Sequence, residues 1–409
     1  MTLLRAELPP TAGLPARWRD FAPPWHHDFA AQAAAWLGAD WALLTSSGTA
    51  ALWIALAALR TLAPQRRRVV LPAYTCPLVA EAVLRAGLTP RLCDTRPGHF
   101  DFDPGQLADC CDADTLAIVS THLAGRVADV ALARRLAASC GAFVIEDVAQ
   151  AFGAQAKGAD GAWHSLGLAG DIGVYSFSVG KGLTLYEGGL LLARDARVRD
   201  ALGDAERSLR RRHAPLLELR RCAELLGYAA LYRPRTLGLV YGAPLRRALA
   251  RGDVVAAVGD SPRRGIPLHR VGAFRQSAGA RGLARYRAHL QAARSRAAAL
   301  RAQLLALPGL HVLADADDQH GIWMFLLLHL PSAAARDRAL APLWGAGLGA
   351  TRLFAHALPD YPQLRGRIES PALPQARAFA ARTLALGNSH WLRPQAMARV
   401  LAALRAALD

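Results

Sequence analysis

Short apolar runs alternate with helical patterns through the first half of the chain, and this alternation restricts the fold more than any other feature of the sequence. We predict strands at 41–45, 69–71, 90–93, 116–120, 143–146, 174–177 and 189–193. Patterns typical of helices separate several of these runs, at 49–61, 76–86 and 127–139. Strands and helices that alternate in this way favour a mostly parallel sheet with helices on both faces. We therefore expect an α/β fold.

The character of the sequence changes after about residue 197, where arginine becomes frequent and amphipathic segments replace the strand pattern. We interpret 206–264 as an arginine-rich helical insertion. Beyond it the sequence predicts a long helix, two strands and three further helices, at 282–307, 311–313, 322–329, 333–344, 375–386 and 394–408. The 409 residues are enough for two domains. We expect a large domain over 1–205, and a long connecting helix with a small C-terminal α/β domain over 265–409.

The chain contains 49 lysine and arginine residues, of which only Lys157 and Lys181 are lysines. Arginine keeps its charge at any ordinary pH, whereas the primary amine of lysine can lose its proton and attack a carbonyl. Lysine amines form Schiff bases with carbonyl substrates and with pyridoxal phosphate (PLP). Lys157 lies in a glycine-rich stretch, where a solvated surface position explains it. Lys181 is therefore the candidate catalytic amine.

The segment 45–52 has the pattern of a strand that passes through a Ser-Ser-Gly-Thr turn directly into a helix. The first N–H groups of a helix, the positive end of its dipole and nearby hydroxyls form an anion site that suits a phosphate. We expect Ser47, Gly48 and Thr49 to form such a site. An ordinary helix cap explains the same residues when they are considered alone.

Asp147 follows an apolar run, at the predicted carboxyl end of a buried strand, where α/β folds place their ligands. A carboxylate in this position can pair with a protonated pyridine nitrogen and keep the ring an electron acceptor. A helix-capping or salt-bridged aspartate is the simpler interpretation of Asp147 in isolation. Ser176 lies near the end of another predicted strand, five residues before Lys181, so its hydroxyl is placed to reach the same phosphate.

The phosphate turn, the aspartate and the lysine occur in the order and with the separations typical of fold-type I PLP enzymes. The sequence resembles the DegT/DnrJ/StrS-type aminotransferase family, densely from about 25 to 200 and more weakly near the C-terminus. The matching segments are Ser47-Gly-Thr-Ala-Ala-Leu52, Pro72-Ala-Tyr-Thr75, His122-Leu-Ala-Gly125, Glu146-Asp-Val-Ala-Gln150, Gly170-Asp-Ile-Gly173, Ser176-Phe177, Glu187-Gly-Gly189 and Gly347-Leu-Gly-Ala-Thr-Arg352.

This resemblance implies the fold-type I architecture, in which a large domain contains a mostly parallel seven-stranded sheet and a small α/β domain follows it. It also implies PLP as the cofactor and a homodimer with active sites at the subunit interface. By resemblance, Lys181 forms the Schiff base and later carries the proton, while Asp147 pairs with the pyridine nitrogen. Gln150 contacts the ring-hydroxyl side, and Tyr74 stacks on the ring face. The other implied site residues are Gly48, Thr49 and Ser176 for the phosphate, with Ser47 in the same turn, and His122, Arg352 and His356 for the substrate.

Three features depart from the family pattern. Leu268 stands where the family has an asparagine that reaches the phosphate of the partner subunit. Arg270 or His269 is left for that contact, or the contact is missing. Tyr186 stands where a glycine is usual, and the insertion at 206–264 has no counterpart. These changes leave the cofactor site nearly whole and the substrate class open.

The bulk composition excludes several classes of protein. The net charge of +17 does not indicate nucleic-acid binding, because arginine is spread along the chain without an interleaved aromatic platform. The basic amphipathic insertion leaves contact with a membrane surface open, but no apolar run reaches the roughly 18 residues of a membrane helix. The N-terminus lacks the pattern of a signal peptide, and the six cysteines show neither paired nor metal-ligand spacing. We expect a cytoplasmic protein with free thiols and no metal.

The resemblance implies a PLP-dependent aminotransferase that moves an amino group, from glutamate, to a keto sugar. A nucleotide-linked sugar is the leading acceptor, and polysaccharide, antibiotic or cell-surface glycan biosynthesis is the implied setting. One alternative is a PLP-dependent lyase or dehydratase of the same fold, and another is a non-catalytic PLP-binding regulatory relative. Histidine replaces the Schiff-base lysine in the dehydratase branch of the family, so Lys181 argues against that reaction. Asp147 and Gln150 argue against a loss of chemistry.

Overall fold

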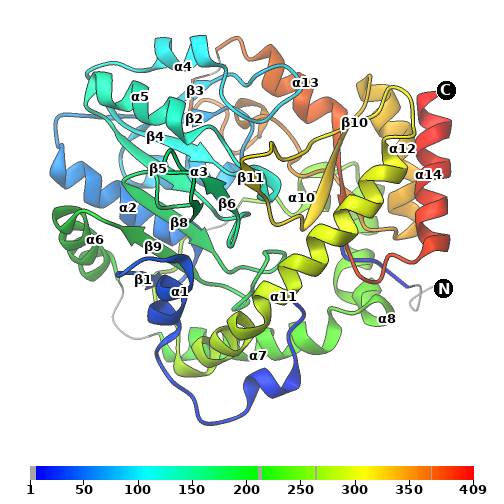
Figure 1. Cartoon of the computed structure of the whole chain (residues 1–409), viewed down its shortest axis with the longest axis horizontal. Helices are drawn as coiled ribbons and strands as arrows, with labels where there is room; N and C mark the ends of the chain where they lie inside the picture. The colour runs from blue at the N-terminus through cyan, green and yellow to red at the C-terminus, as the bar shows by residue number, and fades with distance from the viewer. Residues whose placement is uncertain (1–5, 211–213, 263–264, 370) are drawn as a thin grey trace.

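A seven-stranded sheet forms the centre of the larger part of the molecule (Figure 1). The structure, a computed structural model, describes residues 6–210, 214–262, 265–369 and 371–409. In spatial order the strands of the sheet are β1 (Leu43–Thr45), β9 (Gly189–Ala193), β8 (Ile172–Ser176), β5 (Phe143–Asp147), β4 (Thr115–Thr121), β2 (Arg68–Pro72) and β3 (Thr89–Cys93). Strand β9 is antiparallel to both of its neighbours, and all other adjacent strands are parallel. The predicted α/β fold with a mostly parallel seven-stranded sheet is confirmed.

Helices cover both faces of this sheet, because successive side chains of a strand point to opposite sides. Val70, Ile118 and Val144 belong to β2, β4 and β5, and they pack with helices α4 and α5 on one face. Their neighbours along each strand join the main core with helices α2, α3 and α6 on the other face. The bounds of these helices are α2 (Gly48–Leu62), α3 (Pro77–Arg85), α4 (Pro104–Cys110), α5 (Val130–Cys140) and α6 (Ala196–Leu209).

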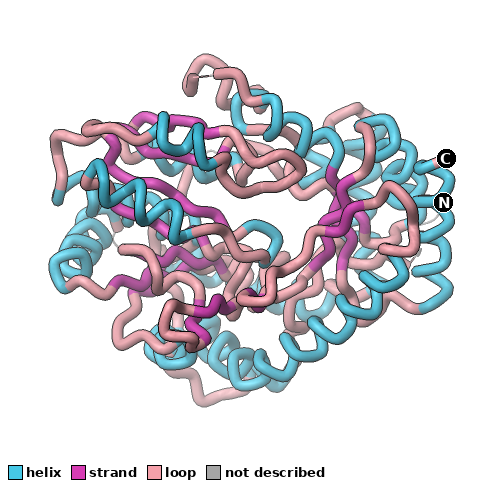
Figure 2. Tube along the Cα trace, turned by 45° about the horizontal axis from the view of Figure 1, so that its top comes forward, coloured by secondary structure: helices cyan, strands magenta, loops and turns pink. Residues whose placement is uncertain are grey.

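A smaller antiparallel sheet lies at the other end of the molecule (Figure 2). The sequence predicts a helix over 375–386, and the last four residues of this prediction are wrong. Helix α13 ends at Arg382, and the next five residues form a strand that pairs along its whole length with β12. A short buried apolar run is compatible with a helix or with a strand, and here its pairing with β12 makes it a strand. The elements here are β10 (His311–Val312), β12 (Phe325–His329), β14 (Thr383–Gly387) and β13 (Ala350–Thr351), with α12 (Ala333–Ala346), α13 (Pro374–Arg382) and α14 (Pro394–Leu408).

The long helix α11 (Ala273–Leu304) connects the two ends and runs diagonally across Figure 1. It begins before the predicted start at 282, because its first turns bury polar side chains, among them Arg275, that hide the helical pattern. Lys157 lies on a small three-stranded sheet and is exposed, as predicted for a surface lysine. The remaining elements are β6 (Gln155–Lys157), β7 (Trp163–Ser165), β11 (Gln319–His320), α1 (Phe29–Leu37), and the short helices η1 (Trp18–Phe21), η2 (Leu123–Gly125) and η4 (Leu358–Asp360).

The segment 206–264 is mostly helical in its described part. Its helices are α7 (Pro215–Leu231), α8 (Pro234–Leu237), η3 (Gly238–Gly242), α9 (Ala243–Ala250) and α10 (Val254–Val258). They share the cores of their neighbours, since Leu225 packs with Phe21, whereas Leu245 and Ala257 join the core of the smaller sheet. The domain boundaries at 205 and 264 stay a prediction.

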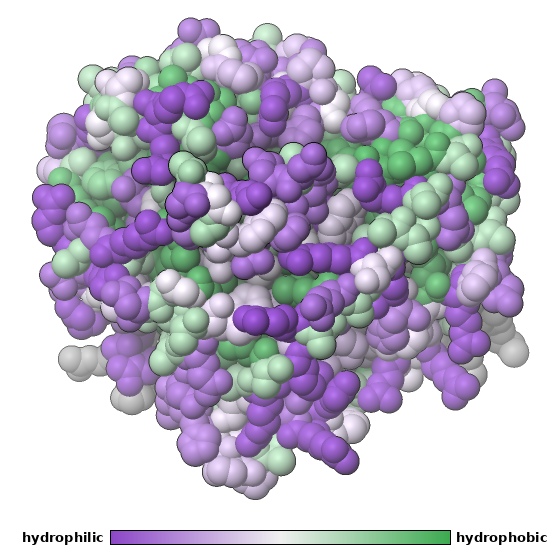
Figure 3. All heavy atoms as spheres, viewed as in Figure 1, coloured by the Kyte–Doolittle hydropathy of each residue, from purple (hydrophilic) through white to green (hydrophobic). Residues whose placement is uncertain are grey.

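Hydrophilic side chains are spread over the face shown in Figure 3, between smaller hydrophobic areas. In the insertion, Arg220 and Arg221 both form ion pairs with Glu224. Two further arginines of this segment, Arg211 and Arg212, lie outside the described residues. Among the helices that the structure describes, none is both long and apolar enough to cross a membrane.

Candidate active site

The carboxyl ends of β4, β5 and β8 meet at one edge of the large sheet, because these strands are parallel neighbours. Thr121, Asp147 and Ser176 end the three strands, and all of them line one cavity of about 310 Å³. The other predicted residues that line this cavity are Ser47, Gly48, Thr49, His122, Gln150, Lys181 and Arg352. The structure thus brings the phosphate turn, the aspartate and the lysine together from distant parts of the sequence.

The phosphate turn forms the start of helix α2. Ser47 caps this helix, because its Oγ accepts the N–H of Ala50 at 3.1 Å. The first N–H groups of a helix have no intrahelical partner, and with the helix dipole they favour an anion. A β-carbon on Gly48 would lie 2.7 Å from the Ser176 Cβ, so glycine is what lets the helix start approach β8 so closely. The Ser176 hydroxyl consequently lies beside the helix start.

Lys181 lies in the loop between β8 and β9, and the N-terminal segment packs against the backbone of this loop. Leu14 donates its N–H to the Gly182 carbonyl at 2.7 Å, and a β-carbon on Gly13 would lie 2.2 Å from the Lys181 carbonyl oxygen. In the same loop Tyr186 adopts φ +65°, a left-handed conformation that favours glycine. This conformation explains why glycine is the usual family residue there.

Asp147 and Gln150 provide polar groups on the β5 side of the cavity. Burial raises the pKa of Asp147, although the N–H of Ala149, 3.0 Å from Oδ1, and the charge of Lys181 act in the opposite direction. A cationic partner would favour the ionised carboxylate. Gln150 Oε1 accepts the N–H of Ala124 at 2.8 Å, so the amide nitrogen is the end that can donate to a ligand.

His122 is fully buried, and both of its ring nitrogens are engaged. Nδ1 accepts the N–H of Ala128 at 3.0 Å, so Nε2 carries the proton donated to Glu146 Oε2 at 3.0 Å. Burial acts to raise the pKa of Glu146, but the hydrogen bond and charge of His122 and the N–H groups of Gly170 and Gly167 lower it overall. His122 therefore has no free ring nitrogen for a substrate, and only the rest of its ring is available to the cavity.

Two of the predicted site residues, Tyr74 and His356, do not line the cavity. The Tyr74 hydroxyl accepts the N–H of Phe354 at 3.3 Å, and its ring centre lies 5.1 Å from that of Phe379. His356 packs edge to face against Tyr361, with ring centres 5.4 Å apart. Stacking of Tyr74 on a cofactor ring stays a prediction.

The segment that replaces the family's asparagine motif lies against the phosphate turn of the same chain. Ser46 Oγ donates to the Pro267 carbonyl at 2.6 Å, and Leu268 is buried in the main core. Arg270 is exposed and does not line the cavity of its own chain. Arg352, predicted for the substrate, does line the cavity and pairs with an acidic side chain of α12.

Thr75, Cys76, Thr121 and Asp260 are among the lining residues that the sequence prediction misses. Thr121 ends a buried parallel strand, and this position, which identifies Asp147 as a candidate, identifies Thr121 equally well. Thr75 belongs to a segment that resembles the family, but the resemblance implies a role only for the neighbouring Tyr74. Asp260 closes the insertion, and no pattern in the sequence places it near the lysine.

The polar groups that line the cavity fit a ligand with a phosphate and a positively charged ring. The hydroxyl oxygens of Thr75 and Thr121 are buried, and no described residue forms a hydrogen bond with either. Buried hydroxyls are normally paired, so both suit a ligand. The anion site at Gly48 suits a phosphate, and the buried carboxylate of Asp147 suits a pyridinium. PLP has both groups.

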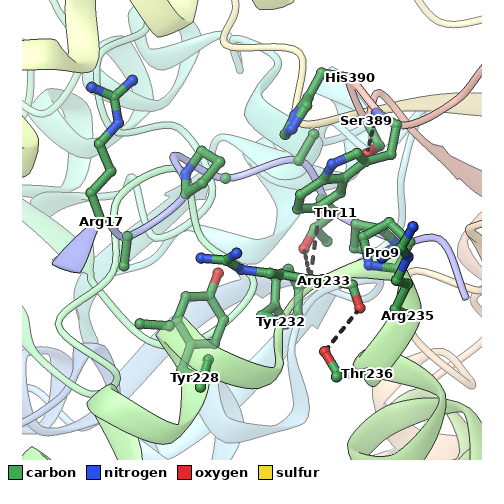
Figure 4. Close-up of a pocket in the computed structure, with 18 of the residues that line it drawn as sticks. Pro9, Thr11, Arg17, Tyr228, Tyr232, Arg233, Arg235, Thr236, Ser389 and His390 are labelled. Carbon is green, nitrogen blue, oxygen red and sulfur yellow. Dashed lines mark hydrogen bonds between the residues drawn. The ribbon is translucent and has the colours of Figure 1, made fainter.

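A second cavity, of about 890 Å³, is lined by the N-terminal segment, the end of α7 and the segment before α14 (Figure 4). Thr11 lines both cavities, and its hydroxyl lies 3.3 Å from that of Tyr232. Among the described residues, the lining of this second cavity contains arginines but no lysine and no carboxylate. Of these two cavities, the smaller one therefore contains the groups suited to amine chemistry.

A model of the DegT/DnrJ/EryC1/StrS aminotransferase family matches residues 16–211 and 270–405. This chain belongs to that family. The predicted resemblance is confirmed, and most of the predicted insertion falls in the stretch that the family model leaves unmatched.

Relatives from three bacteria match part of the chain. Protein MosB of Rhizobium meliloti is 36% identical over 169 residues, which are 41% of this chain and 32% of that protein. UDP-N-acetyl-3-dehydro-alpha-D-glucosamine 3-aminotransferase of Acidithiobacillus ferrooxidans is 37% identical over 154 residues, 37% of this chain and 40% of the relative. L-glutamine:2-deoxy-scyllo-inosose aminotransferase of Streptomyces kanamyceticus is 35% identical over 150 residues, 37% of this chain and 34% of the relative. Each match spans less than half of the relative's own length.

The fold matches nearly the whole length of one solved structure. The sugar aminotransferase CalS13 from Micromonospora echinospora superposes with a TM-score of 0.71, covering 98% of this chain and 99% of that one. The two sequences are 22% identical, so the likeness establishes the shared fold.

Proposed function

We propose that this protein is a PLP-dependent aminotransferase that transfers an amino group to the keto group of a sugar or a sugar-like ring. The observation that carries the proposal is that Lys181, Asp147 and the start of helix α2 line the same cavity. Membership of an aminotransferase family and relatives named for amination of a keto sugar nucleotide and of a cyclitol ketone support it.

Three polar residues of the cavity act on the reactive part of the cofactor in this proposal. When bound, PLP supplies an aldehyde that exchanges amines and a pyridinium ring that accepts electrons. Lys181 provides the amine that holds the aldehyde, and after release it moves protons as a positioned base. Asp147 keeps the ring nitrogen protonated, because a carboxylate favours the charged form of a neighbouring base. Gln150 donates its amide N–H to the ring-hydroxyl side.

The phosphate site of the proposal combines the start of helix α2 with hydroxyls. The N–H groups of Gly48 and Thr49 and the hydroxyl of Ser176 bind the phosphate oxygens, and the dipole of α2 stabilises their charge. Ser47 holds the helix start in place, since its Oγ accepts the N–H of Ala50.

We further propose a homodimer in which each active site lies at the subunit interface. Val179 supports this arrangement, because it lines the cavity and yet is 40% exposed, as an apolar residue covered by a partner would be in one chain alone. Arg270, exposed and outside its own cavity, is the candidate for contact with the partner's cofactor phosphate. If so, Arg270→Ala lowers PLP affinity about tenfold, and unchanged affinity would remove Arg270 from the site.

The reaction can be tested with the purified full-length protein and PLP. L-glutamate and L-glutamine serve as donors, and UDP-N-acetyl-3-dehydro-α-D-glucosamine and 2-deoxy-scyllo-inosose serve as acceptors. We expect an amine product by mass spectrometry, with one donor consumed in equal amount. A dehydrated product without donor consumption would instead identify the lyase alternative. A protein that binds PLP but converts none of these pairs would contradict the proposed function.

A further inference from the structure

The end of the insertion forms one wall of the active-site cavity. Tyr241, Val258, Gly259 and Asp260 line the cavity, although the family model leaves 212–269 unmatched. Helix α10 ends at Val258, and Gly259 follows with φ +84°, the left-handed conformation that ends helices and favours glycine. This turn, closed by a hydrogen bond from the Asp260 N–H to the Val255 carbonyl, brings Asp260 to the cavity.

The Asp260 carboxylate is held at one of its two oxygens. Oδ2 accepts the hydroxyl of Tyr361 at 2.5 Å and the N–H of Ala355 at 2.9 Å, both from the C-terminal part of the chain. Burial raises the pKa of Asp260 to about 6, against these two hydrogen bonds and the charge of Lys181. The group is therefore mostly ionised at neutral pH, and Oδ1 is the oxygen that can accept from a ligand.

The charges of the cavity lining restrict which ligand group suits Asp260. The only carboxylates among the described lining residues are Asp147 and Asp260. Asp147 ends a strand of the large sheet, whereas Asp260 lies beside the loop that carries Arg352 and Phe354, on the wall made by the insertion and the smaller sheet. A carboxylate repels a phosphate and the carboxylate of an amino-acid donor, but it accepts strong hydrogen bonds from hydroxyls.

We propose that Asp260 is a specificity-determining residue of the amino acceptor, and that its Oδ1 accepts hydrogen bonds from ring hydroxyls beside the keto group. Tyr361 and Ala355 orient the carboxylate by holding Oδ2. This inference rests on the proposed function and adds to it the residue that recognises the hydroxyls of the acceptor ring. Asp260 lies in the stretch that the family model leaves unmatched, so this subsite is not one that the family model describes.

The decisive variant is Asp260→Asn, because an asparagine oxygen can still accept from Tyr361 and Ala355 while the second oxygen and the charge are lost. The matched control is Asp253→Asn, which changes an exposed helix cap of the same insertion to another good cap. The donor half-reaction is followed with L-glutamate through the PLP absorbance, and the acceptor half-reaction with 2-deoxy-scyllo-inosose and with cyclohexanone, which has no hydroxyls.

We expect Asp260→Asn to leave the donor half-reaction within about twofold of wild type. The preference in kcat/KM for 2-deoxy-scyllo-inosose over cyclohexanone should fall about 10- to 100-fold, as for loss of a hydrogen bond to a charged group. Asp253→Asn should change neither rate. An unchanged preference, or a wild-type protein that does not prefer the hydroxylated ketone, would overturn the inference. An equal loss of rate in both half-reactions would also overturn the inference. It would show that Asp260 only stabilises the contact between its own segment and the loop at 355.

A different measurement, on the wild-type protein with amino donors alone, shows whether the proposed function itself is wrong. A wild-type protein whose PLP absorbance does not respond to L-glutamate or L-glutamine contradicts the aminotransferase proposal. Calorimetric titration with 2-deoxy-scyllo-inosose still tests the subsite in that case. Weaker binding to Asp260→Asn than to Asp253→Asn supports the hydroxyl contact, and equal binding overturns it.

Discussion

Gly48 and Ser176 approach each other so closely that a β-carbon on the glycine would lie 2.7 Å from the Ser176 Cβ and 3.0 Å from its Oγ. The first residue is the start of helix α2, and the second ends strand β8. Their contact places the free N–H groups of a helix and a hydroxyl on the same side of the cavity. The anion site therefore depends on the absence of one methyl group.

Gly48→Ala should weaken both the fold and cofactor binding. The added carbon must displace α2 or β8, which costs about 1–3 kcal/mol of unfolding free energy, as other overpacked sites do. We expect PLP affinity to fall as well, because the displaced helix start no longer meets Ser176. Denaturant unfolding and PLP titration measure the two effects. Gly227→Ala is the control, since its β-carbon would meet nothing within 4 Å inside α7, and it should stabilise the protein by up to about 1 kcal/mol.

Lys181→Ala should abolish the covalent attachment of PLP and the activity. Only a primary amine can make that attachment, and Lys181 is the one lysine that lines the cavity. The wild-type protein should be yellow, and borohydride should fix the cofactor to it irreversibly. Lys157→Ala removes the other lysine of the chain, which is exposed, and should behave as wild type. Retention of borohydride-fixed cofactor in Lys181→Ala would refute the assignment.

Thr121→Val should have opposite effects on the protein without and with its cofactor. The hydroxyl of Thr121 is buried and has no partner among the described residues, so its removal should stabilise the cofactor-free protein by about 1–2 kcal/mol. The same change should weaken PLP binding several-fold, because the cofactor then loses a hydrogen-bond partner. Thermal unfolding with and without PLP tests both signs. A variant that binds PLP as tightly as wild type would place Thr121 outside the cofactor contacts.

Asp260→Asn should make the protein more stable at neutral pH. Burial raises the pKa of Asp260 from 3.8 to about 6, so ionisation costs the folded state up to about 3 kcal/mol. This cost is absent below about pH 4, grows between about pH 4 and 6, and is complete above about pH 6. The stability gain of the variant should follow the same course in denaturant unfolding series. An equal gain at pH 4 and pH 7.5 would show that the charge is not the cause.

A functional carboxylate that destabilises the fold is a common compromise between stability and activity. In this protein the compromise would lie in a segment that the family model leaves unmatched. The gain in stability of Asp260→Asn and its loss of acceptor preference would then be two consequences of one change.

The alternation of strands and helices determined the α/β class and all seven strands of the large sheet. Parallel strands bring their carboxyl ends to one edge, so the sequence also determined that Asp147 and Ser176 meet near Lys181. These features follow from the local periodicity of the sequence and the order of its strands, and they do not depend on how side chains pack. The start of the helix at Gly48 could also be predicted from the sequence, because a run of glycine and hydroxyl residues indicates a helix start directly.

Only the tertiary structure decided the rest. Thr383–Gly387 is a strand because β12 pairs with it, although its short apolar run allows a helix. Tyr74 packs against Phe379 instead of lining the cavity, since neighbouring residues of a bend can point to opposite sides. Asp260 reaches the active site because a helix end, Tyr361 and a backbone N–H converge there from segments far apart in the chain. Such contacts depend on how distant segments pack together, and no local pattern in the sequence encodes them.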